Sequence, residues 1–256
     1  MINRNLEALA KQLYDYWFVQ FDFPDENGRP YKSSGGKMVW NEVLKREVPE
    51  GWVVKRLGDI AALNNRTLTK NDRFETIKYL DTSSLTDNQI TSVQLLKRNN
   101  APSRAQRKVE DLTILYSLVR PRLRHFGIIS HPSENMIVST GFVTIDVYQK
   151  NLAVYTYLNL TSEKVIEYLG NVADTAVSSY PSINPSDMES LLFIMPPVEL
   201  VDVFNNEVES LFRLFNRNQE EINTFTLQRD ELLPLLMNGQ VEVKQLNSDL
   251  SNILIL

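Results

Sequence analysis

The chain contains no cysteine among its 256 residues, and histidine occurs only at His125 and His131. Disulfide bonds and thiolate metal sites are therefore excluded, and two histidines without a partner motif do not make a zinc or catalytic centre. No run of eighteen apolar residues occurs, and the first twenty residues carry charges where a signal peptide would be apolar. We expect a soluble, cytoplasmic protein with no metal, no membrane contact and a function that lies in binding surfaces or carboxylate chemistry.

Charge is unevenly distributed along the chain, although the net charge is only -5. Residues 97–125, called the basic segment below, contain eight lysines and arginines against two acidic residues. Residues 198–256 contain four basic against ten acidic residues. A basic centre and an acidic end indicate two different kinds of partner, because local charge decides what a surface attracts.

Two segments show the apolar spacing of helices that pack along their length. Residues 3–20 place apolar side chains at Leu6, Leu9 and Leu13, which predicts a helix of about five turns. After the Pro196-Pro197 pair, a seven-residue repeat of apolar side chains continues for about 40 residues and predicts a helix of roughly 60 Å. We call its positions the C-terminal stripe: Val201, Phe204, Val208, Leu211, Phe215, Asn218, Ile222, Phe225, Leu232 and Leu236.

The two helices differ in length, and the difference has a consequence for assembly. The N-terminal helix offers about 30 Å of apolar surface, which covers only half of the C-terminal stripe. The remainder would be an exposed apolar patch, so we expect a second chain to cover it. The alternative is a simple helical hairpin that stabilises one domain, which is the commoner fate of amphipathic helices. Asn218 and Arg229 interrupt the repeat, and polar residues at such positions can fix register and partner number.

Between the helices the pattern is that of an α+β domain. Residues 22–51 read as an ordered connector, because a free linker would not carry the five aromatic side chains that lie within it and directly beside it, Phe21, Phe23, Tyr31, Trp40 and Trp52. Residues 52–197 contain short strand-like runs and one helical stretch, at 152–170, with a break near Thr161 and Ser162. The predicted organisation is helix 1–21, connector 22–51, domain 52–197, helix 198–240 and tail 241–256. The predicted strands are VVKRL, IKYLD, LTILYSLV, FGIIS, MIVS, GFVTIDVY and LLFIM.

Three linked motifs carry a family resemblance. The segment from residue 9 to residue 52 contains WF-x-x-FDFP, G-x-PYKSSGGKM and R-x-VPEGW. It resembles the central conserved region of the specificity (S) subunits of type I restriction-modification systems. YLDTSSLTDNQI, PSRAQRKVEDLTILYSLVRP, IVSTGF and SYPSINPSDMESLLFIMPP are similar to one target-recognition domain of that family. QRDELLPLLMNGQVEV is similar to the end of its distal conserved helix.

The resemblance implies a non-catalytic subunit that reads double-stranded DNA. In the family, two target-recognition domains lie at opposite ends of an antiparallel pair of conserved helices, which form a coiled coil, set the spacing and dock two methyltransferase (M) subunits. The M subunits hold S-adenosylmethionine and methylate adenine N6, and an ATP-driven restriction (R) subunit cleaves DNA. This chain should itself hold no cofactor, with S-adenosylmethionine, ATP and Mg²⁺ confined to the partners. It resembles the second half of an S subunit, so we expect a homodimer that reads a split palindrome.

The basic segment supplies the expected DNA contacts. Arginine and lysine neutralise phosphates, and arginine can also make bidentate bonds to guanine. The alternative is a solvated loop that touches nothing, as most runs of charge are. The candidate contacts are Ser103, Arg104, Arg107, Lys108, Arg120, Arg122, Arg124 and His125.

Two other functions are weighed against this one. The chain could be a silent recombination cassette or a structural coiled-coil fragment that no longer reads DNA. It could also be a nuclease, since Glu242-Val243-Lys244 has the carboxylate-x-lysine spacing of some nucleases, although no upstream acid is positioned to complete a site. A methyltransferase is not expected, because Met195-Pro196-Pro197-Val198 lacks the polar residue before and the aromatic residue after the two prolines.

Overall fold

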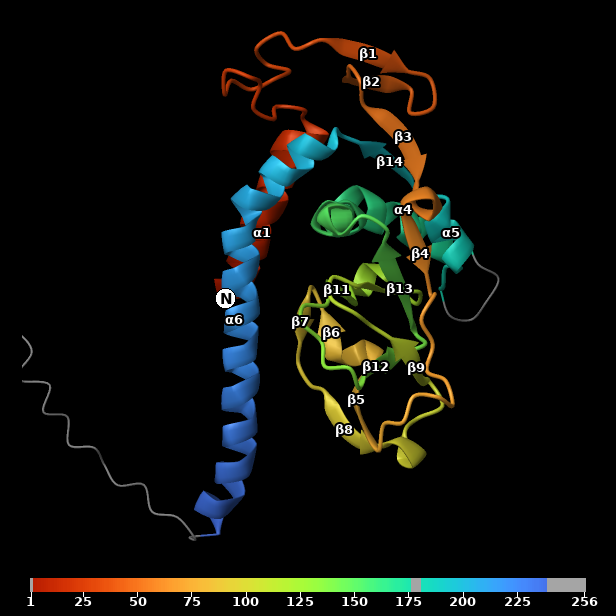
Figure 1. Ribbon diagram of the computed structural model, residues 1–256, viewed down its shortest axis with the longest axis vertical. Coiled ribbons are helices and arrows are strands. Elements are labelled where there is room, and N and C mark those ends of the chain that lie inside the picture. Colours follow the sequence, from red (N-terminus) through yellow and green to blue (C-terminus); the bar gives the residue numbers. More distant parts are fainter. Residues whose placement is uncertain (1, 176–180, 239–256) are drawn as a thin grey trace, which may run out of the picture.

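A long helical rod runs beside a mixed domain of helices and strands, and a connector joins them at one end (Figure 1). This computed structural model describes residues 2–175 and 181–238. The expected α+β class is confirmed. The predicted tail, 241–256, lies outside the described residues. Among the described helices, none has an apolar stretch long enough to cross a bilayer.

The helices and strands follow one another closely. The helices are α1 (Ile2–Tyr14), α2 (Leu57–Ile60), α3 (Ala153–Leu160), α4 (Glu163–Asp174), α5 (Pro185–Glu189) and α6 (Val198–Met237), with shorter turns η1 (Asp15–Val19), η2 (Thr82–Ser84), η3 (Arg98–Asn100), η4 (Pro121–Leu123) and η5 (Lys150–Leu152). The strands are β1 (Met38–Asn41), β2 (Arg46–Pro49), β3 (Val53–Arg56), β4 (Ala61–Leu63), β5 (Thr76–Leu80), β6 (Leu85–Thr86), β7 (Gln89–Ile90), β8 (Gln94–Lys97), β9 (Ala105–Lys108), β10 (Ile114–Ser117), β11 (Phe126–Ile128), β12 (Met136–Ser139), β13 (Phe142–Val147) and β14 (Leu192–Met195).

The strands form two four-stranded sheets and three two-stranded ribbons. The sheets have the orders β11-β10-β13-β4 and β8-β5-β12-β9, and the ribbons are β1-β2, β14-β3 and β6-β7. Every residue of β10, β12 and β13 is buried, which explains why their sequences read as continuous apolar runs. Leu115, Val138 and Phe142 pack together between the sheets, and fully burying each such side chain contributes about 1.5–3 kcal/mol.

The predicted elements of the domain are confirmed where the apolar pattern was strong. All seven predicted strand runs contain a strand. The break near Thr161 also exists: the Thr161 side chain donates to the carbonyl oxygen of Tyr157 at 2.8 Å, and α3 ends there. Within the domain, β4, β6, β7, β8 and β9 were not predicted. They have two to four residues each, and β4, β8 and β9 lie at the edges of their sheets, so their apolar patterns are short.

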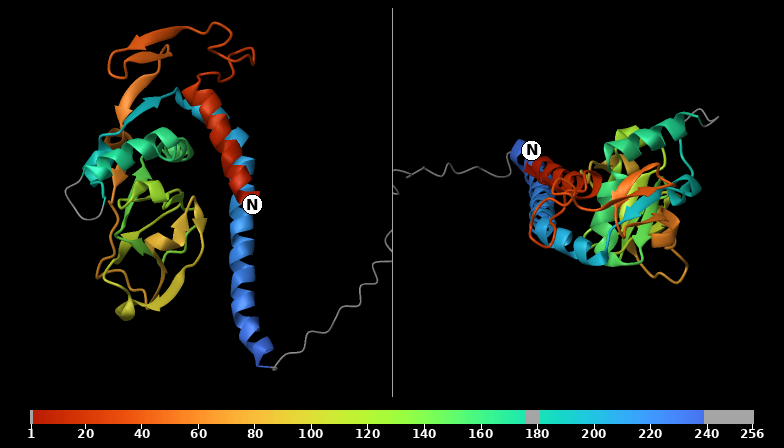
Figure 2. Two further views of the ribbon diagram at one scale, coloured as in Figure 1. Left: turned by 180° about the vertical axis from the view of Figure 1, so that it is seen from behind. Right: turned by 90° about the horizontal axis from the view of Figure 1, so that it is seen from above.

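Helices α1 and α6 pack antiparallel. At one end the rings of Phe18 and Phe204 meet edge to face with centroids 4.9 Å apart, and at the other Asn218 donates to Asn3 at 2.9 Å. The left view of Figure 2 shows α1 beside the first part of α6 only. Beyond this contact, Ile222 is 51% exposed and Phe225 is 64% exposed. The expected mismatch in helix length is therefore present within the chain.

The buried face of α1 differs from the predicted one in one position. Leu6 is buried and Leu13 is half-buried, but Leu9 is 50% exposed, while Ala10 is 1% exposed. The reason is that α1 packs against α3 as well as α6, which turns its buried face toward Ala10 and Tyr14. Leu9 thus lies outside the buried face of α1, and its expected role in contact with a second chain stays a prediction.

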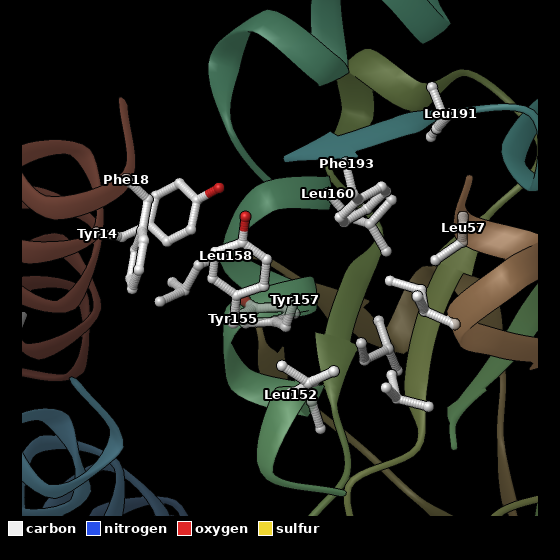
Figure 3. Close-up of a cluster of buried hydrophobic side chains, with 14 of the residues drawn as sticks. Tyr14, Phe18, Leu57, Leu152, Tyr155, Tyr157, Leu158, Leu160, Leu191 and Phe193 are labelled. Carbon is white, nitrogen blue, oxygen red and sulfur yellow. The ribbon is translucent and has the colours of Figure 1, made fainter. Parts of the chain in front are cut away.

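Polar bonds fix α1 against α3. The Tyr157 hydroxyl donates to Glu7 Oε1 at 2.7 Å, and the Asn159 amide donates to the Tyr14 hydroxyl at 2.7 Å. Aromatic side chains surround these bonds, as Figure 3 shows for Tyr14 and Phe18 opposite Tyr155. Tyr155 lies edge to face with Phe18 at 4.9 Å. The rod is therefore joined to the domain by a dry core and not by a hinge.

The connector lies against this core, as predicted. Phe21 is 0% exposed and Trp52 6%, and their rings meet edge to face at 5.4 Å. Phe23 stacks on Tyr31 with centroids 4.6 Å apart. Buried aromatic area of this kind holds the 22–51 segment in place at the top of the molecule in Figure 1.

The Tyr157–Glu7 bond yields a test of the rod–domain junction. Replacing Tyr157 by Phe leaves the nearly buried Glu7 carboxylate with Lys11 as its charged partner. We expect the free energy of unfolding in urea to fall by about 1–3 kcal/mol, since a hydrogen bond to a charged group is lost. The control is Tyr148→Phe, whose side chain is 66% exposed and which should change stability by less than about 0.5 kcal/mol. Equal losses in both variants would contradict this role for the junction.

Candidate nucleic-acid interface

The eight predicted DNA contacts fall into two groups on different sheets. Ser103, Arg104, Arg107 and Lys108 lie before and within β9, at the edge of the β8-β5-β12-β9 sheet. The second group lies in the turn from β10 to β11, and consists of Arg120, Arg122, Arg124 and His125.

Arg122 is held by carboxylates of α4. Its Nη1 donates to Asp174 at 2.7 Å, and its Nε and Nη2 donate to the two oxygens of Glu167 at 3.3 and 3.1 Å. Nη2 also donates to Asn171 at 2.7 Å, and the absent side chain at Gly170 leaves room for the guanidinium to lie on the helix. Hydrogen bonds to Glu167 and Asp174 raise the pKa of Arg122. Arg122 therefore braces η4 on α4, and its charge is matched locally.

Arg124 and His125 are likewise engaged within the domain. Arg124 Nη2 donates to both oxygens of Glu163, at 2.7 and 2.6 Å, and this contact raises the pKa of the guanidinium. His125 Nδ1 lies 2.7 Å from the Leu85 carbonyl oxygen and 3.0 Å from the Thr86 hydroxyl, which ties β6 to the turn. The geometry gives both side chains a structural role, and their contact with DNA stays a prediction.

The first group holds a neighbouring loop, residues 64–75. Lys108 forms an ion pair with Asp72, and this contact holds the pKa of the Asp72 carboxyl well below its usual value. Arg107 Nη1 donates to the Thr67 hydroxyl at 3.3 Å. Ser103 and Arg104, by contrast, are exposed. Within the described residues, Arg104 forms no ion pair, so its charge faces solvent.

A single turn brings the two groups together. Between β12 and β13, the Thr140 N–H donates to the Arg104 carbonyl oxygen at 2.8 Å, and the Leu118 N–H donates to the Gly141 carbonyl oxygen at 3.2 Å. After Leu118 the chain continues through exposed Val119 and Arg120, the latter with a left-handed backbone, φ 49°. Arg104 and Arg120 therefore lie on exposed segments that each form a backbone hydrogen bond with the same turn.

Sequence analysis missed two exposed cations. Lys70 and Arg73 belong to loop 64–75, outside the basic segment. Arg98 Nη2 donates to the Thr69 carbonyl oxygen at 2.6 Å and joins this loop to η3, and a cleft of about 250 Å³ between them is lined by Lys70, Arg98 and Ser103. The signal was present in RTLTKNDR, a polar run with three cations and one acid, but it lay apart from the larger cluster.

The arrangement fits binding of a polyanion. Exposed cations just before β9, on loop 64–75 and on the β10–β11 turn can contact phosphates from several directions. Tyr116, on β10 directly before the turn, is 0% exposed and belongs to the core, so it does not stack on a base; burial raises the pKa of its hydroxyl. Among the described residues, no three carboxylate or histidine side chains are grouped as metal ligands.

The second candidate surface is the half of α6 beyond Asn218. Of the C-terminal stripe, Val201, Phe204, Val208 and Phe215 are buried within the chain, and Leu211 and Asn218 are half-buried. The last four positions are exposed: Ile222, Phe225, Leu232 and Leu236. An apolar row of this length on one face of a helix is typical of a contact with another helix.

Comparisons with known proteins identify relatives along the whole chain. The sequence model described as type I restriction modification DNA specificity domain matches residues 49–224. The type I restriction enzyme MjaIX specificity subunit of Methanocaldococcus jannaschii is 24% identical over 268 residues, covering 95% of this chain and 55% of the relative. The HindI specificity subunit of Haemophilus influenzae is 24% identical over 150 residues, covering 58% and 32%. The chain thus spans about half the length of the first relative and about a third of the second.

Two solved structures share the fold. A chain described under "Structural basis underlying complex assembly and conformational transition of the type I R-M system" has a TM-score of 0.54 at 22% identity, covering 78% of this chain and 53% of that chain. The HsdS subunit from Thermoanaerobacter tengcongensis has a TM-score of 0.50 at 23% identity, covering 73% and 48%.

Arg122 is bonded to α4 whereas Arg104 is exposed, and this difference yields a test. Arg122→Ala should lower the urea midpoint of unfolding, because it removes four hydrogen bonds between η4 and α4, and the loss should shrink in high salt. Arg104→Ala should leave the midpoint unchanged, since the side chain is exposed. An unchanged midpoint in Arg122→Ala would show that the contacts with α4 do not brace the turn.

Proposed function

Because this chain belongs to the family of type I restriction-modification DNA specificity domains, we propose that it reads DNA sequence for a methyltransferase and restriction complex and has no catalytic role of its own. The resemblance seen in its sequence motifs is confirmed by the family match and by the specificity subunits to which the chain is similar. The family membership does not say how a chain that spans about half the length of such a relative recognises DNA.

The DNA-reading proposal rests on one observation: the two groups of predicted contacts lie beside the same turn, Thr140–Gly141. Arg104 and Arg120 are exposed, on segments that each form a backbone hydrogen bond with the Thr140–Gly141 turn. Arg122 and Arg124 are bonded to acids of α4. Exposed arginines can contact phosphate oxygens or base edges, and the two that are bonded to α4 hold the shape of the surface. We therefore assign Arg104, Arg120, Lys70 and Arg73 as contacts, and Arg122 and Arg124 as positioning residues.

The exposed half of α6 supports a homodimer. A second copy placed about a two-fold axis presents the same row of side chains in the opposite direction, so that Ile222 to Leu236 of one chain pack on those of the other. Asn218 is bonded to Asn3 in the first turn of α1, so α1 covers the C-terminal stripe only up to this position. The partner's α6 would continue from there along the same row, in line with α1. The result is an antiparallel coiled coil in which every position of the C-terminal stripe is covered.

Two domains held by such a rod would read two halves of one site. Since the subunits are identical, the two half-sites must be inverted copies, which makes the target a split palindrome. M subunits, which would carry S-adenosylmethionine, would dock on the rod and domains, and an R subunit would use ATP and Mg²⁺. This assignment of partners and cofactors rests on the family.

The dimer proposal is tested on α6. The double variant Ile222→Lys/Phe225→Lys places charges on the uncovered row and should convert a dimer to a monomer in light scattering. Leu227→Lys is the matched control, because Leu227 is 67% exposed but lies outside the row. Phe215, which sequence analysis also placed on this surface, is 5% exposed and packed within the chain, so it is unsuitable for this test. A mass unaffected by the double variant would refute the interface.

DNA reading is tested by mapping N6-methyladenine in a host that expresses this chain together with its cognate M subunit, against a host lacking this chain. We expect a split palindrome that appears only with the chain, and weaker modification with Arg104→Ala. An asymmetric split motif would contradict the homodimer and indicate pairing with a different half. The absence of a new motif would contradict DNA reading and favour a silent cassette.

A further inference from the structure

An apolar groove opens at the surface beside the junction of the rod and the domain. It has a volume of about 680 Å³ and lies between η1, α3, α4 and β14. Its floor includes the buried side chains of Phe18 and Leu158, and Leu192 on its rim is 42% exposed. Figure 3 shows Tyr14 and Phe18 on one side and Leu158 on the other. The groove is distinct from the basic surface, because it is lined by neither loop 64–75 nor β9.

One wall of the groove is the open edge of a strand. Among the described strands, β14 pairs only with β3. The Leu57 N–H donates to the Leu191 carbonyl oxygen, so the alternate residues Leu192 and Ile194 direct their peptide groups away from β3. Both residues line the groove, and the Ile194 carbonyl accepts a hydrogen bond from the Tyr155 hydroxyl. An extended apolar segment laid in the groove could therefore add a third strand to the ribbon.

The chain itself contains a segment of this kind beyond α6. Residues 252–256 read NILIL, four consecutive apolar side chains of high β-propensity after one asparagine. As a strand, this segment would direct alternate side chains to the groove floor and leave its backbone to pair with β14. We propose that residues 252–256 of one subunit occupy the groove of the other subunit, adding a strand to β14. The proposal rests on the homodimer described above.

The length of chain between the end of α6 and residue 252 decides whether the segment occupies the groove of its own chain or that of a second copy. The groove lies at the level of Phe204 on α6, since Phe18 both lines the groove and packs on Phe204. From Asn238 back to that level, the rise along the helix is about 51 Å. Fourteen residues separate Asn238 from Asn252, and even fully extended they span about 46–50 Å. The segment would have to be completely taut to reach its own groove.

The second copy's groove is much nearer. In the antiparallel dimer, the end of one α6 lies beside Asn218 of the other, where α1 begins. From Asn218 to the level of Phe204 the rise is about 21 Å, which the same fourteen residues span with slack even after crossing one helix diameter of about 10 Å. Each subunit would thus clamp the rod–domain junction of its partner.

The absence of native cysteine allows a direct test by disulfide trapping in the full chain. A chain with Leu192→Cys is mixed with a second, differently tagged chain that carries Ile253→Cys or Leu254→Cys. Two neighbouring tail positions are used because only one of them would face the groove in a strand. Mild oxidation should join the two differently tagged chains. Val53→Cys is the matched control, because Val53 is 52% exposed on β3 and does not line the groove. Removal of residues 247–256 should weaken dimerisation by about tenfold or more, the equivalent of one buried leucine.

The outcomes separate this proposal from the dimer on which it rests. Light scattering before oxidation gives the mass of the mixture. A dimer that forms no Leu192→Cys disulfide with either tail position, or cross-links equally with Val53→Cys, overturns the docking of the segment and leaves the dimer standing. A disulfide that forms only within a chain carrying both cysteines overturns docking on the partner. A monomeric mass overturns both proposals.

Discussion

The packing of α1 against α6 and α3 together is the constraint on which the rest of the molecule depends. A helix that packed on α6 alone would leave the domain free to swing on its connector. Here the ring of Phe18 touches both Phe204 and Tyr155, and Glu7 accepts the hydroxyl of Tyr157. Rod and domain therefore share one core, and separating them would break the hydrogen bond between Tyr157 and Glu7.

The same packing leaves the apolar row on the second half of α6 exposed. It also limits how far the domain extends along the rod. Asn216 donates to Ser130 at 3.1 Å and Gln219 donates to the Ile90 carbonyl oxygen at 3.0 Å. These are polar contacts at the level where α1 begins. The contacts of the rod with the domain thus extend to Gln219, and beyond it the apolar row of α6 is exposed among the residues that the structure describes.

The sequence could predict those features in which one physical signal dominated. Continuous apolar runs became buried strands, and a 40-residue repeat became α6. Leu9 lies outside the buried face of α1, and a repeat read along one helix could not show this, because a third element, α3, turns that face. The basic segment was correctly seen as a cluster, but sequence cannot show that Arg122 and Arg124 meet acids of α4 about forty residues away. Lys70 and Arg73 reach the same surface only through the folding of loop 64–75 against η3.

The rigid junction also limits the spacing of the two half-sites in the proposed dimer. If the uncovered residues 219–238 pair about a two-fold axis, the axis crosses α6 near residue 228. The last contact of the domain with α6, at Gln219, then lies about 14 Å from the axis along the rod, and the two domains begin about 27 Å apart. One turn of DNA is about 34–36 Å, so domains that extend outward from these points face grooves at least one turn apart. Because no hinge separates rod from domain, the spacing is set by the length of α6 beyond Gln219, and inserting one heptad there would lengthen it by about 10 Å.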